Sequence, residues 1–548
     1  ATHGFTAVAF LSNIQFWRES GYFDAASHEK WLLHTWSLSV EWQFYLLFPL
    51  LLLLAWKLLA NQRYITILLV IGFVLSLSLS VGLTAWYPSA AFFLLPTRAW
   101  EMLAGGLVYL LADKWTAGRK NGRFLELSGF FLIIVSVVQF SENTPWPGIL
   151  AAIPVGGTAM VLLSARQRSW LTHSLPLQAI GIWSYSIYLW HWPLAVGLFY
   201  FGIEDAPIAV IAAILASILL GWFSYELIEK PTRRILARPK PIVSGFSLAA
   251  VVLFVAGFGL AIRSADGIPG RLPPSVEFIA AQSQNFNKVR RLNCHGWGGY
   301  DFNSCIHGGQ EVGAILVGDS HASAVATAVE QALPSPSHGV LTFSYTSCPT
   351  IFGVRKRDRP DLKCAEFNEW VMQEIADLPA EIPIIIVNRT SGNVFGSNRP
   401  TEANFGRPTA YFSEVVDSPT EEFQAEFSKQ LKNSVSRIAE TRPVFLVRPI
   451  PEMPVDVPSI AARKELIGQP IHINTSLEEY HDRHALVWQA QDRAREQCGV
   501  EILSPLPELC DEKKCHGLKN GRPLYYDSHH LSEYGNKYLA PMFQKVFY

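Results

Sequence analysis

The sequence has few charged residues and no concentration of basic ones. Asp, Glu, Lys and Arg make up 17% of its 548 residues and the net charge is -1, whereas soluble domains contain about 25% charged residues. Without a basic domain or a nucleic-acid-binding motif, nucleic acid is not expected as a partner. Hydrophobic residues make up 49% of the chain and are concentrated between Val40 and Ile262, whereas charged residues, Pro and Asn become common after Arg263. The composition therefore predicts a membrane region followed by a globular region.

The membrane region is predicted from eight apolar runs. They span residues 40–60, 64–84, 89–112, 125–140, 148–164, 178–201, 207–225 and 242–262. A helix needs about 20 apolar residues to cross the hydrocarbon core of a bilayer, and several of these runs approach that length. Together they leave too little polar surface for a soluble domain, so we expect a polytopic all-α membrane domain in a lipid bilayer.

The loops between these runs predict the orientation, because Lys and Arg accumulate on the cytoplasmic side. Alternate loops carry these residues: Lys57 and Arg63; Lys114, Arg119, Lys120 and Arg123; Arg166 and Arg168; Lys230, Arg233, Arg234, Arg238 and Lys240. The intervening loops, such as SENTPWP and GIEDAP, carry none. The run 242–262 is therefore expected to lead outward, with everything after Arg263 outside the cytoplasm.

Cysteine is absent from the first 293 residues, and all seven Cys follow the last apolar run. Disulfides persist in oxidising compartments, so this distribution supports an exported C-terminal domain. Proximity along the chain suggests the pairs 294/305, 348/364 and 510/515 and leaves Cys498 unpaired. Sequence alone does not fix this connectivity.

The chain starts with Ala-Thr-His and contains neither an initiating Met nor a signal peptide. Its first residues, ATHGFTAVAFLSNIQFW, are typical of the end of a hydrophobic segment. We therefore expect a fragment that lacks its first membrane spans.

The globular region has the pattern of an α/β domain. After a linker or strapping segment at 263–292, VGAILVGDSHAS predicts a buried strand, a tight turn and a helix. Further buried strands are predicted at 382–388 and 442–450, with helices at 419–439 and 476–497. Alternating strands and helices predict a parallel sheet covered by helices, whose ligands bind at the carboxyl ends of the strands. Ser320 and Asn388 both lie at such ends.

Ser320 can act as a nucleophile only with a base within reach. The C-terminal stretch YYDSHHLSEYG supplies Asp527 and His530, three residues apart, so the carboxylate can orient the imidazole toward the serine. An oxyanion hole is expected from backbone N–H groups at the turn and from the Asn388 amide. Two other interpretations remain: Asp319 or Ser320 only caps the following helix, and His529 and His530 are surface or metal-binding histidines.

The order of these residues resembles the SGNH (GDSL-like) hydrolase superfamily. The resemblance implies a flavodoxin-like three-layer fold with Ser320 as nucleophile, Asn388 as oxyanion donor and Asp527 with His530 completing the triad. Asn393 is the alternative to Asn388, and His529 the alternative to His530. The glycine of the second sequence block has no clear match, because both Ser347 and Gly353 lie in the corresponding stretch SYTSCPTIFG.

Four strings in the membrane region carry charged or polar residues: LLHTWSLSVEWQFYLLFP, LPTRAWEMLAGG, IGIWSYSIYLWHWPL and SYELIEKPTRR. Ionisable groups at membrane depth usually face the interior of a bundle. Arg98 and Glu101 share a helix face and can neutralise each other, so a purely structural ion pair is the alternative to a functional one. The topology puts His34 and Glu41 near the outer surface. His191 lies among aromatic residues of the kind that mark the membrane interface.

Taken together, these strings resemble the acyltransferase-3 family of membrane O-acyltransferases, in the subgroup with a C-terminal SGNH domain. The resemblance implies an acyltransferase-3 domain at 1–241, a further transmembrane helix at 242–262, the linker at 263–292 and the SGNH domain at 293–548. Its membrane-domain candidates are Glu41, Arg98, Glu101 and His191. The Arg and His that the family carries in its first membrane helix have no counterpart here, and His34 does not replace them.

The family resemblance also implies an activity. Cytoplasmic acetyl-CoA would be the acyl donor, and the acceptor would be lipopolysaccharide O-antigen or another envelope glycan, polymeric or lipid-linked. The protein is expected in the bacterial inner membrane with its C-terminal domain in the periplasm, without a metal cofactor. Two alternatives are a glycan O-acetyl esterase and a transporter or sensor whose exported domain only binds glycan.

Overall fold

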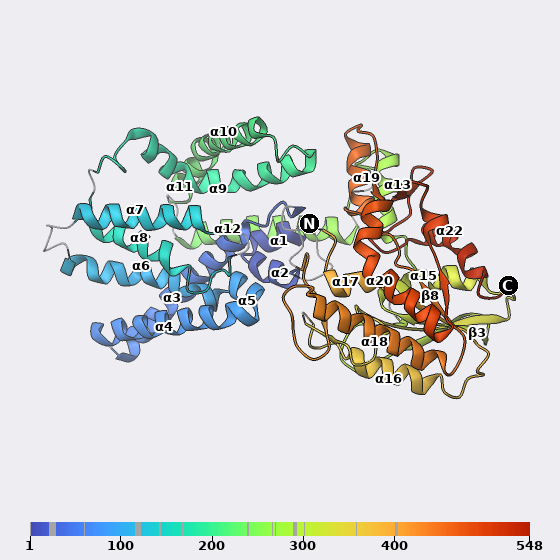
Figure 1. Ribbon diagram of the computed structural model, residues 1–548. Helices are drawn as coiled ribbons and strands as arrows, with labels where there is room; N and C mark the ends of the chain where they lie inside the picture. Colours follow the sequence, from blue (N-terminus) through green and yellow to red (C-terminus); the bar gives the residue numbers. More distant parts are fainter. Residues whose placement is uncertain are drawn as a thin grey trace. The chain divides into compact units, whose positions relative to one another are not determined.

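The computed structural model describes residues 2–20, 29–59, 61–115, 122–141, 144–166, 169–237, 241–265, 267–268, 270–288, 293–300, 302–357, 359–399 and 404–548. The chain divides into two compact units, Ala1–Pro269 and Gly270–Tyr548 (Figure 1). The finer division that the sequence predicts, at residues 241, 262 and 292, stays a prediction.

The first unit consists of helices. They are α1 (Thr2–Val8), α2 (Ser12–Arg18), α3 (Thr35–Leu59), α4 (Gln62–Trp86), α5 (Pro88–Phe93), α6 (Leu95–Trp115), α7 (Gly122–Gln139), α8 (Ala152–Ser164), α9 (Leu175–Phe201), α10 (Pro207–Ser224), a π-helical turn (Tyr225–Glu229), α11 (Lys230–Leu236) and α12 (Pro241–Ser264). Five helical stretches are long and apolar enough to cross a membrane: Thr35–Leu59, Gln62–Trp86, Gly122–Gln139, Pro207–Leu236 and Ile242–Ser264. The chain is therefore that of a membrane protein.

Three of the eight predicted spans differ from continuous membrane-length apolar helices. The run 89–112 is interrupted after Phe93, and α6 begins beside Pro96, which favours the first turn of a helix. α8 has 13 residues, which is about 20 Å of helix. α9 has 27 residues but contains many Trp, Tyr, Ser and His side chains. The eight-span topology stays a prediction; Arg119, Lys120, Arg168, Arg238 and Lys240 lie outside the described residues, as does the side chain of Lys114.

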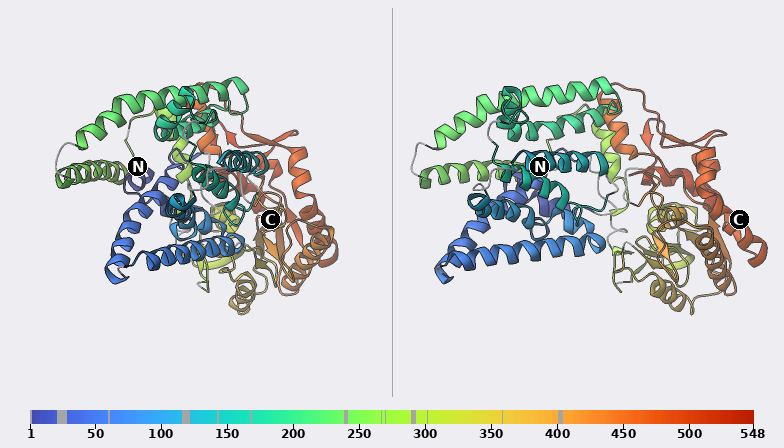
Figure 2. Two further views of the ribbon diagram at one scale, coloured as in Figure 1. Left: turned by 90° about the vertical axis from the view of Figure 1, so that its left-hand side faces the viewer. Right: turned by 60° about the vertical axis from the view of Figure 1, so that its left-hand side comes forward.

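Neighbouring helices of this unit pack in pairs, among them α7 with α8 and α9 with α10 (Figure 2). Where α7 crosses α8, a Cβ on Gly129 would lie 2.5 Å from the carbonyl oxygen of Gly157, and a Cβ on Gly157 would lie 2.8 Å from that of Gly129. Small residues let helix backbones approach closely where lipid provides no hydrophobic driving force. This pair of glycines therefore sets the closeness of the crossing.

The second unit contains a seven-stranded sheet. Its path is β1 (His295–Gly296), β4 (His338–Tyr345), β3 (Glu311–Gly318), β6 (Ile384–Val387), β8 (Val444–Val447) and β10 (Glu501–Leu503), with β2 (Ser304–Gly308) antiparallel to β4. All pairs along the path are parallel. Five strands of this path, β3, β4, β6, β8 and β10, can be numbered 1 to 5 in chain order. Their spatial order is then 2-1-3-4-5, which is the flavodoxin-like order. The order reverses between β3 and β6, and ligands of such sheets bind at that point.

Helices cover both faces of this sheet (Figure 1). Along β3, Ala314 and Leu316 contribute to one core, and Ile315 and Val317 to the other, because successive side chains of a strand point to opposite faces. The first core is covered by α13 (Pro274–Ala280), α15 (Ser320–Ala332), α19 (Val457–Leu466) and α22 (Glu533–Gln544). The second is covered by α16 (Cys364–Glu374), α18 (Glu421–Ala439) and α20 (Leu477–Cys498). The predicted three-layer α/β fold is confirmed.

Short elements complete the unit: a 3-10 turn (Ala281–Gln284), β5 (Arg355–Lys356), α17 (Thr390–Phe395), β7 (Ala410–Tyr411), β9 (Asn474–Ser476), α21 (Leu506–Leu509), β11 (Lys514–His516), β12 (Leu518–Lys519) and β13 (Arg522–Pro523).

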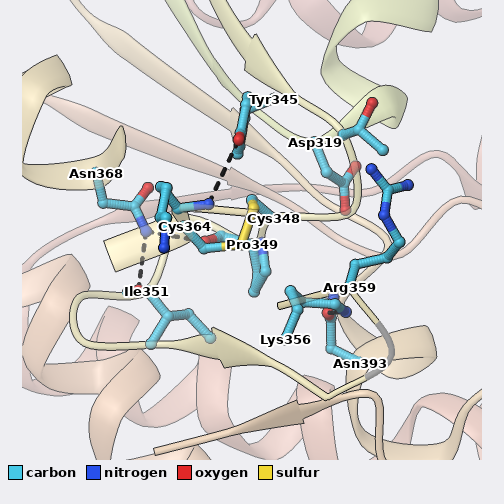
Figure 3. The surroundings of a disulfide bond; sticks show 12 residues. Asp319, Tyr345, Cys348, Pro349, Ile351, Lys356, Arg359, Cys364, Asn368 and Asn393 are labelled. Atoms are coloured by element: carbon cyan, nitrogen blue, oxygen red, sulfur yellow. Dashed lines mark hydrogen bonds between the residues drawn. A yellow bond between two sulfur atoms is a disulfide. The ribbon is translucent and has the colours of Figure 1, made fainter. Parts of the chain in front are cut away.

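The three predicted disulfides are present, Cys294–Cys305, Cys348–Cys364 and Cys510–Cys515, and Cys498 is free. Figure 3 shows the Cys348–Cys364 bond, beside which the Asn368 amide donates to the carbonyl oxygens of Pro349 and Ile351.

Candidate active site

Ser320 is the first residue of α15, two residues after the end of β3 at Gly318. The turn between them depends on Gly318, because a Cβ there would lie 1.9 Å from the carbonyl oxygen of Val387 on the neighbouring strand β6. Asp319 caps the helix by accepting a hydrogen bond from the backbone N–H of His321 at 2.9 Å. The capping interpretation therefore holds for Asp319, and the Ser320 hydroxyl is left to face the C-terminal segment.

Ser320, His530 and Asp527 form a continuous hydrogen-bonded chain. The Ser320 Oγ lies 2.8 Å from Nε2 of His530, and Nδ1 of His530 lies 2.6 Å from Oδ2 of Asp527. The other carboxylate oxygen of Asp527 accepts from the backbone N–H groups of His529 and His530, at 2.8 and 2.7 Å. The structure thus brings together the predicted triad residues, and His530, rather than its alternative His529, contacts the serine.

The electrostatics of this chain favour an ionised Asp527. Burial alone would raise its pKa, but the charges of His530 and His529 and their hydrogen bonds outweigh burial, and the pKa lies well below its usual range. A carboxylate bonded to Nδ1 fixes the imidazole tautomer that leaves Nε2 able to accept the serine proton. The geometry therefore suits nucleophilic catalysis by Ser320.

A pocket opens beside Ser320. It is lined by Phe286, Asn287, His295, Ser320, Ser323, Ala324, Tyr526 and Glu533. The ring of Tyr526 packs against two others, with its centroid 5.0 Å from that of Phe286 and 5.1 Å from that of His530. Residues 286 and 287 belong to the segment predicted as a linker or strap, so this segment contributes to the wall of the pocket.

Asn388 follows β6 at the point where the strand order reverses, next to the Ser320 turn. Its side-chain oxygen accepts from the backbone N–H of Asp319 at 3.1 Å, and its amide nitrogen donates to Oγ1 of Thr350 at 3.2 Å. Asp319 also accepts from the backbone N–H of Arg389 at 2.7 Å. These bonds tie the ends of β3 and β6 together, and the oxyanion role of Asn388 stays a prediction.

The alternatives from the sequence lie elsewhere. Asn393, the alternative to Asn388, accepts a hydrogen bond from Nζ of buried Lys356 at 2.7 Å (Figure 3). Ser347 and Gly353, the two matches for the second-block glycine, both have positive φ, at 57° and 76°. Neither is among the residues that line the pocket beside Ser320. The residue from this stretch that contacts Asn388 is Thr350, which the sequence did not single out.

Sequence reasoning also missed a buried ion-pair group behind the site. Glu452 is 4% exposed, and one of its carboxylate oxygens lies 2.8 Å from Nη2 of Arg389 and 3.0 Å from Nη2 of Arg483. Burial would raise the pKa of Glu452, but the two guanidinium groups hold it well below its usual range. Because Arg389 also donates its backbone N–H to Asp319, this group anchors the loop after β6.

In the membrane unit, the four candidate residues lie in three separate places. Arg98 and Glu101 form the predicted ion pair, with Nη1 and Oε1 3.1 Å apart. The rings of His191 and His34 lie 5.7 Å apart, centre to centre, and Nδ1 of His191 is 2.6 Å from the carbonyl oxygen of Tyr188. Glu41 accepts a hydrogen bond from the hydroxyl of Tyr45 at 2.7 Å. Functional roles for these four residues stay predictions.

Comparison with known proteins gives the same two parts. An acyltransferase domain matches residues 3–226, and an SGNH domain of the kind fused to AT3 domains matches residues 293–545. An uncharacterized protein of Haemophilus influenzae is 30% identical over 172 residues, which are 30% of this chain and 70% of the relative. The chain belongs to the acyltransferase-3 family.

Two further relatives of this acyltransferase-3 chain have names that state an activity. A Komagataeibacter xylinus protein, provisionally named membrane-bound transacylase BcsY, is 29% identical over 235 residues, which are 42% of this chain and 58% of the relative. Peptidoglycan O-acetyltransferase OatA of Listeria monocytogenes is 28% identical over 294 residues, which are 46% of each chain. The acyltransferase-3 chain therefore spans about half the length of these two relatives.

Among solved structures, the periplasmic domain of a lipopolysaccharide acetyltransferase of Salmonella ser. Paratyphi A aligns with 50% of the acyltransferase-3 chain and 98% of its own. The sequences are 15% identical and the TM-score is 0.35.

Proposed function

We propose that the protein is a membrane O-acetyltransferase that acetylates an extracytoplasmic glycan of the bacterial envelope through an acetyl-Ser320 intermediate. The observation that carries the proposal is the hydrogen-bonded chain from Ser320 through His530 to Asp527. Membership of the acyltransferase-3 family and the presence of membrane-length helices support it.

The triad supports two balanced half-reactions. In the first, Nε2 of His530 takes the proton from Ser320 as Oγ attacks the acyl carbonyl, and the leaving group departs with that proton. In the second, Nε2 takes the proton from a sugar hydroxyl, whose oxygen attacks the acetyl-serine ester. The ester bond to Ser320 breaks, and the serine regains its proton. Asp527 stabilises the imidazolium in both steps.

Charge that develops on the carbonyl oxygen needs nearby donors. The backbone N–H of Ser320 is at the first position of α15, where a helix leaves its N–H groups without intrahelical partners. The Asn388 amide is the second proposed donor. It would have to exchange its bond to Thr350 for one to the oxyanion as the intermediate forms.

The proposed acyl donor is acetyl-CoA on the cytoplasmic side. In this proposal the membrane unit passes the acetyl group across the bilayer, and the SGNH unit receives it in the periplasm. The disulfides of the SGNH unit support an oxidising compartment for it. The proposed acceptor is lipopolysaccharide O-antigen or a related envelope glycan, and the proposed location of the protein is the inner membrane. The Listeria relative is named a peptidoglycan O-acetyltransferase, and peptidoglycan is also a glycan of the bacterial envelope.

The test is acetylation of surface polysaccharide in a host that lacks this activity. The native gene is expressed as wild type and as Ser320→Ala, and O-acetyl groups are quantified by mass spectrometry. We expect acetylation with the wild type and at least about a thousandfold less with Ser320→Ala, because the nucleophile is removed. Ser418→Ala is the control, because Ser418 is exposed and is not among the residues that line the pocket beside Ser320. This variant should retain activity.

Two outcomes would contradict the proposal. Equal acetylation by wild type and Ser320→Ala would mean that Ser320 is not an obligatory carrier and would favour a glycan-binding unit. Purified protein that removes acetyl groups from polysaccharide, in a host that never gains them, would identify an esterase. An equal loss with the Ser418→Ala control would mean that the assay follows the amount of folded protein, so folded protein is quantified for each variant.

A further inference from the structure

Three histidines lie together at the proposed active site, and the proposed mechanism uses only one of them. Each of His321, His529 and His530 has a ligand nitrogen, and these nitrogen atoms all lie within 4.8 Å of one another. The ring centroid of His321 lies 5.5 Å from that of His529 and 4.9 Å from that of His530. The centroids of His529 and His530 lie 4.2 Å apart. All three side chains are buried.

The side chain of His321 makes no hydrogen bond with the described residues. It is 1% exposed, and neither Nδ1 nor Nε2 has a hydrogen-bond partner there. An unpartnered buried polar group costs free energy, so such a group calls for a ligand or a function. His529 uses Nδ1 in a contact with the Ser528 hydroxyl at 2.9 Å, which directs its Nε2 elsewhere.

The charges near the three imidazoles can accommodate a cation. The guanidinium of Arg389 is paired with the carboxylate of Glu452, with Nη2 and Oε2 2.8 Å apart. The carboxylate of Asp527 adds negative charge, because its Oδ1 lies 3.8 Å from Nδ1 of His529.

We infer that His321, His529 and His530 form a binding site for a transition-metal cation of the Zn²⁺ type, which competes with Ser320 for His530. In such sites three imidazole nitrogens bind Zn²⁺ at about 2.1 Å, and a fourth position is open to water. The three nitrogens, which lie within 4.8 Å of one another, would therefore have to approach to about 3.4 Å. Rotation of the imidazole rings would have to provide that movement. The bond from Nδ1 of His530 to Asp527 is the carboxylate support that metal-ligating histidines commonly have.

Occupation of the site removes the general base. When the Nε2 lone pair of His530 binds the metal, the hydrogen bond from Ser320 breaks, and no group is left to take the serine proton. The metal is therefore an inhibitor of acyl transfer. This inhibition rests on the proposed function, whereas the binding does not.

The test uses the full chain purified in detergent. Binding of Zn²⁺ is measured by calorimetry, and the coordination by the visible absorption spectrum of Co²⁺. We expect one equivalent to bind to the wild type, and His321→Leu to bind at least about tenfold more weakly. Leucine removes the ligand without breaking a hydrogen bond of the described residues. Ser320→Ala should bind more tightly than wild type, because it removes the competitor for Nε2.

His516→Ala is the matched control, because His516 and Asp511 form a surface pair, 3.0 Å apart, that could bind Zn²⁺ on its own. This variant should bind as the wild type does. Thermal unfolding of each variant checks that it is folded, and His529→Gln gives a second test if His321→Leu is unstable. Hydrolysis of a chromogenic acetate ester, with and without Zn²⁺, measures the inhibition relative to the metal-free rate of each variant.

The outcomes separate the two proposals. Wild-type affinity in both His321→Leu and His529→Gln would overturn the site and assign binding to the surface. Loss of binding in His516→Ala would do the same. Binding at the site without inhibition of a Ser320-dependent hydrolysis would overturn the competition. If Ser320→Ala hydrolyses the ester as wild type does, the proposed function fails while the comparison of metal affinities still stands.

Discussion

The ring of Tyr526 lies parallel to the imidazole of His530, with an interplanar angle of 2° and centroids 5.1 Å apart. The backbone N–H of Tyr526 also donates to the carbonyl oxygen of His530 at 3.1 Å. The imidazole is thus held flat against one aromatic face while its two nitrogens contact Ser320 and Asp527.

This support predicts a graded effect of substitution at Tyr526. Tyr526→Phe keeps the ring and should lower kcat by less than about threefold, whereas Tyr526→Ala removes the stack and should lower it by about tenfold, since aromatic pairs contribute about 1 kcal/mol beyond their buried area. The measurement is acetyl-ester turnover by the full chain. Equal kcat values for the two variants would mean that the stack does not position the imidazole.

Asp527→Asn tests the orientation of the base. The amide oxygen can still accept from the backbone N–H groups of His529 and His530, but an amide nitrogen would face Nδ1 and favour the tautomer with a protonated Nε2. We expect kcat to fall about 10³- to 10⁴-fold with little change in stability. Asp511→Asn, at an exposed turn, is the control. A loss of less than tenfold would show that Asp527 does not control the tautomer.

The ion-pair group around Glu452 predicts a pH dependence of stability. Its folded pKa is depressed below the usual value, so its contribution is present above about pH 4.5 and is lost as the pH falls below that value. Glu452→Gln should cost about 3–5 kcal/mol at pH 7, because it leaves the buried guanidinium of Arg389 and the partly buried guanidinium of Arg483 without their anion. The free energy of unfolding of Glu452→Gln should also fall less on acidification than that of the wild type. Hydrogen exchange of peptides from residues 270–548 measures both effects.

Glu369→Gln is the matched control for that experiment. Glu369 pairs with Arg437 through two contacts of 2.7 Å, but both side chains are 48% exposed, so this pair should contribute less than about 1 kcal/mol. Equal costs for Glu452→Gln and Glu369→Gln would mean that burial does not strengthen the group behind the active site.

The disulfides predict a ranking that follows loop length. Cys348 and Cys364 are separated by 16 residues and Cys510 and Cys515 by 5, so replacing both members with Ala should cost about 3 and about 2 kcal/mol respectively. The loss arises because the unfolded chain gains more freedom from opening the longer loop. Chemical denaturation under oxidising conditions gives the values, and Cys498→Ala, which breaks no disulfide, should match the wild type. The reverse ranking would point to native contacts instead.

Much of the site could be predicted from the sequence because it depends on short-range patterns. The apolar run before Gly318 identifies the strand, and the three-residue spacing of Asp527 and His530 puts acid and base on one turn. The three disulfides follow from pairing neighbours along the chain. The strand β4 was missed, because Thr and Ser interrupt its apolar residues.

The rest depends on contacts between distant segments, which no local pattern encodes. The strand order depends on the pairing of β3 with β6. The hydrogen bond from Asn388 to Thr350 joins residues 38 positions apart. The pairing of Arg389 with Glu452 spans 63 residues. His321 is separated from His529 by most of the globular region, so their proximity also appears only in the folded chain.

The nucleophile and its base are 210 residues apart, and α15, which carries Ser320, packs against α22, which follows His530. Reactivity is therefore a property of the finished fold alone. A chain whose C-terminal segment has not yet folded carries an ordinary serine hydroxyl, and the hydrogen bond between Ser320 and His530 forms only when that segment has docked.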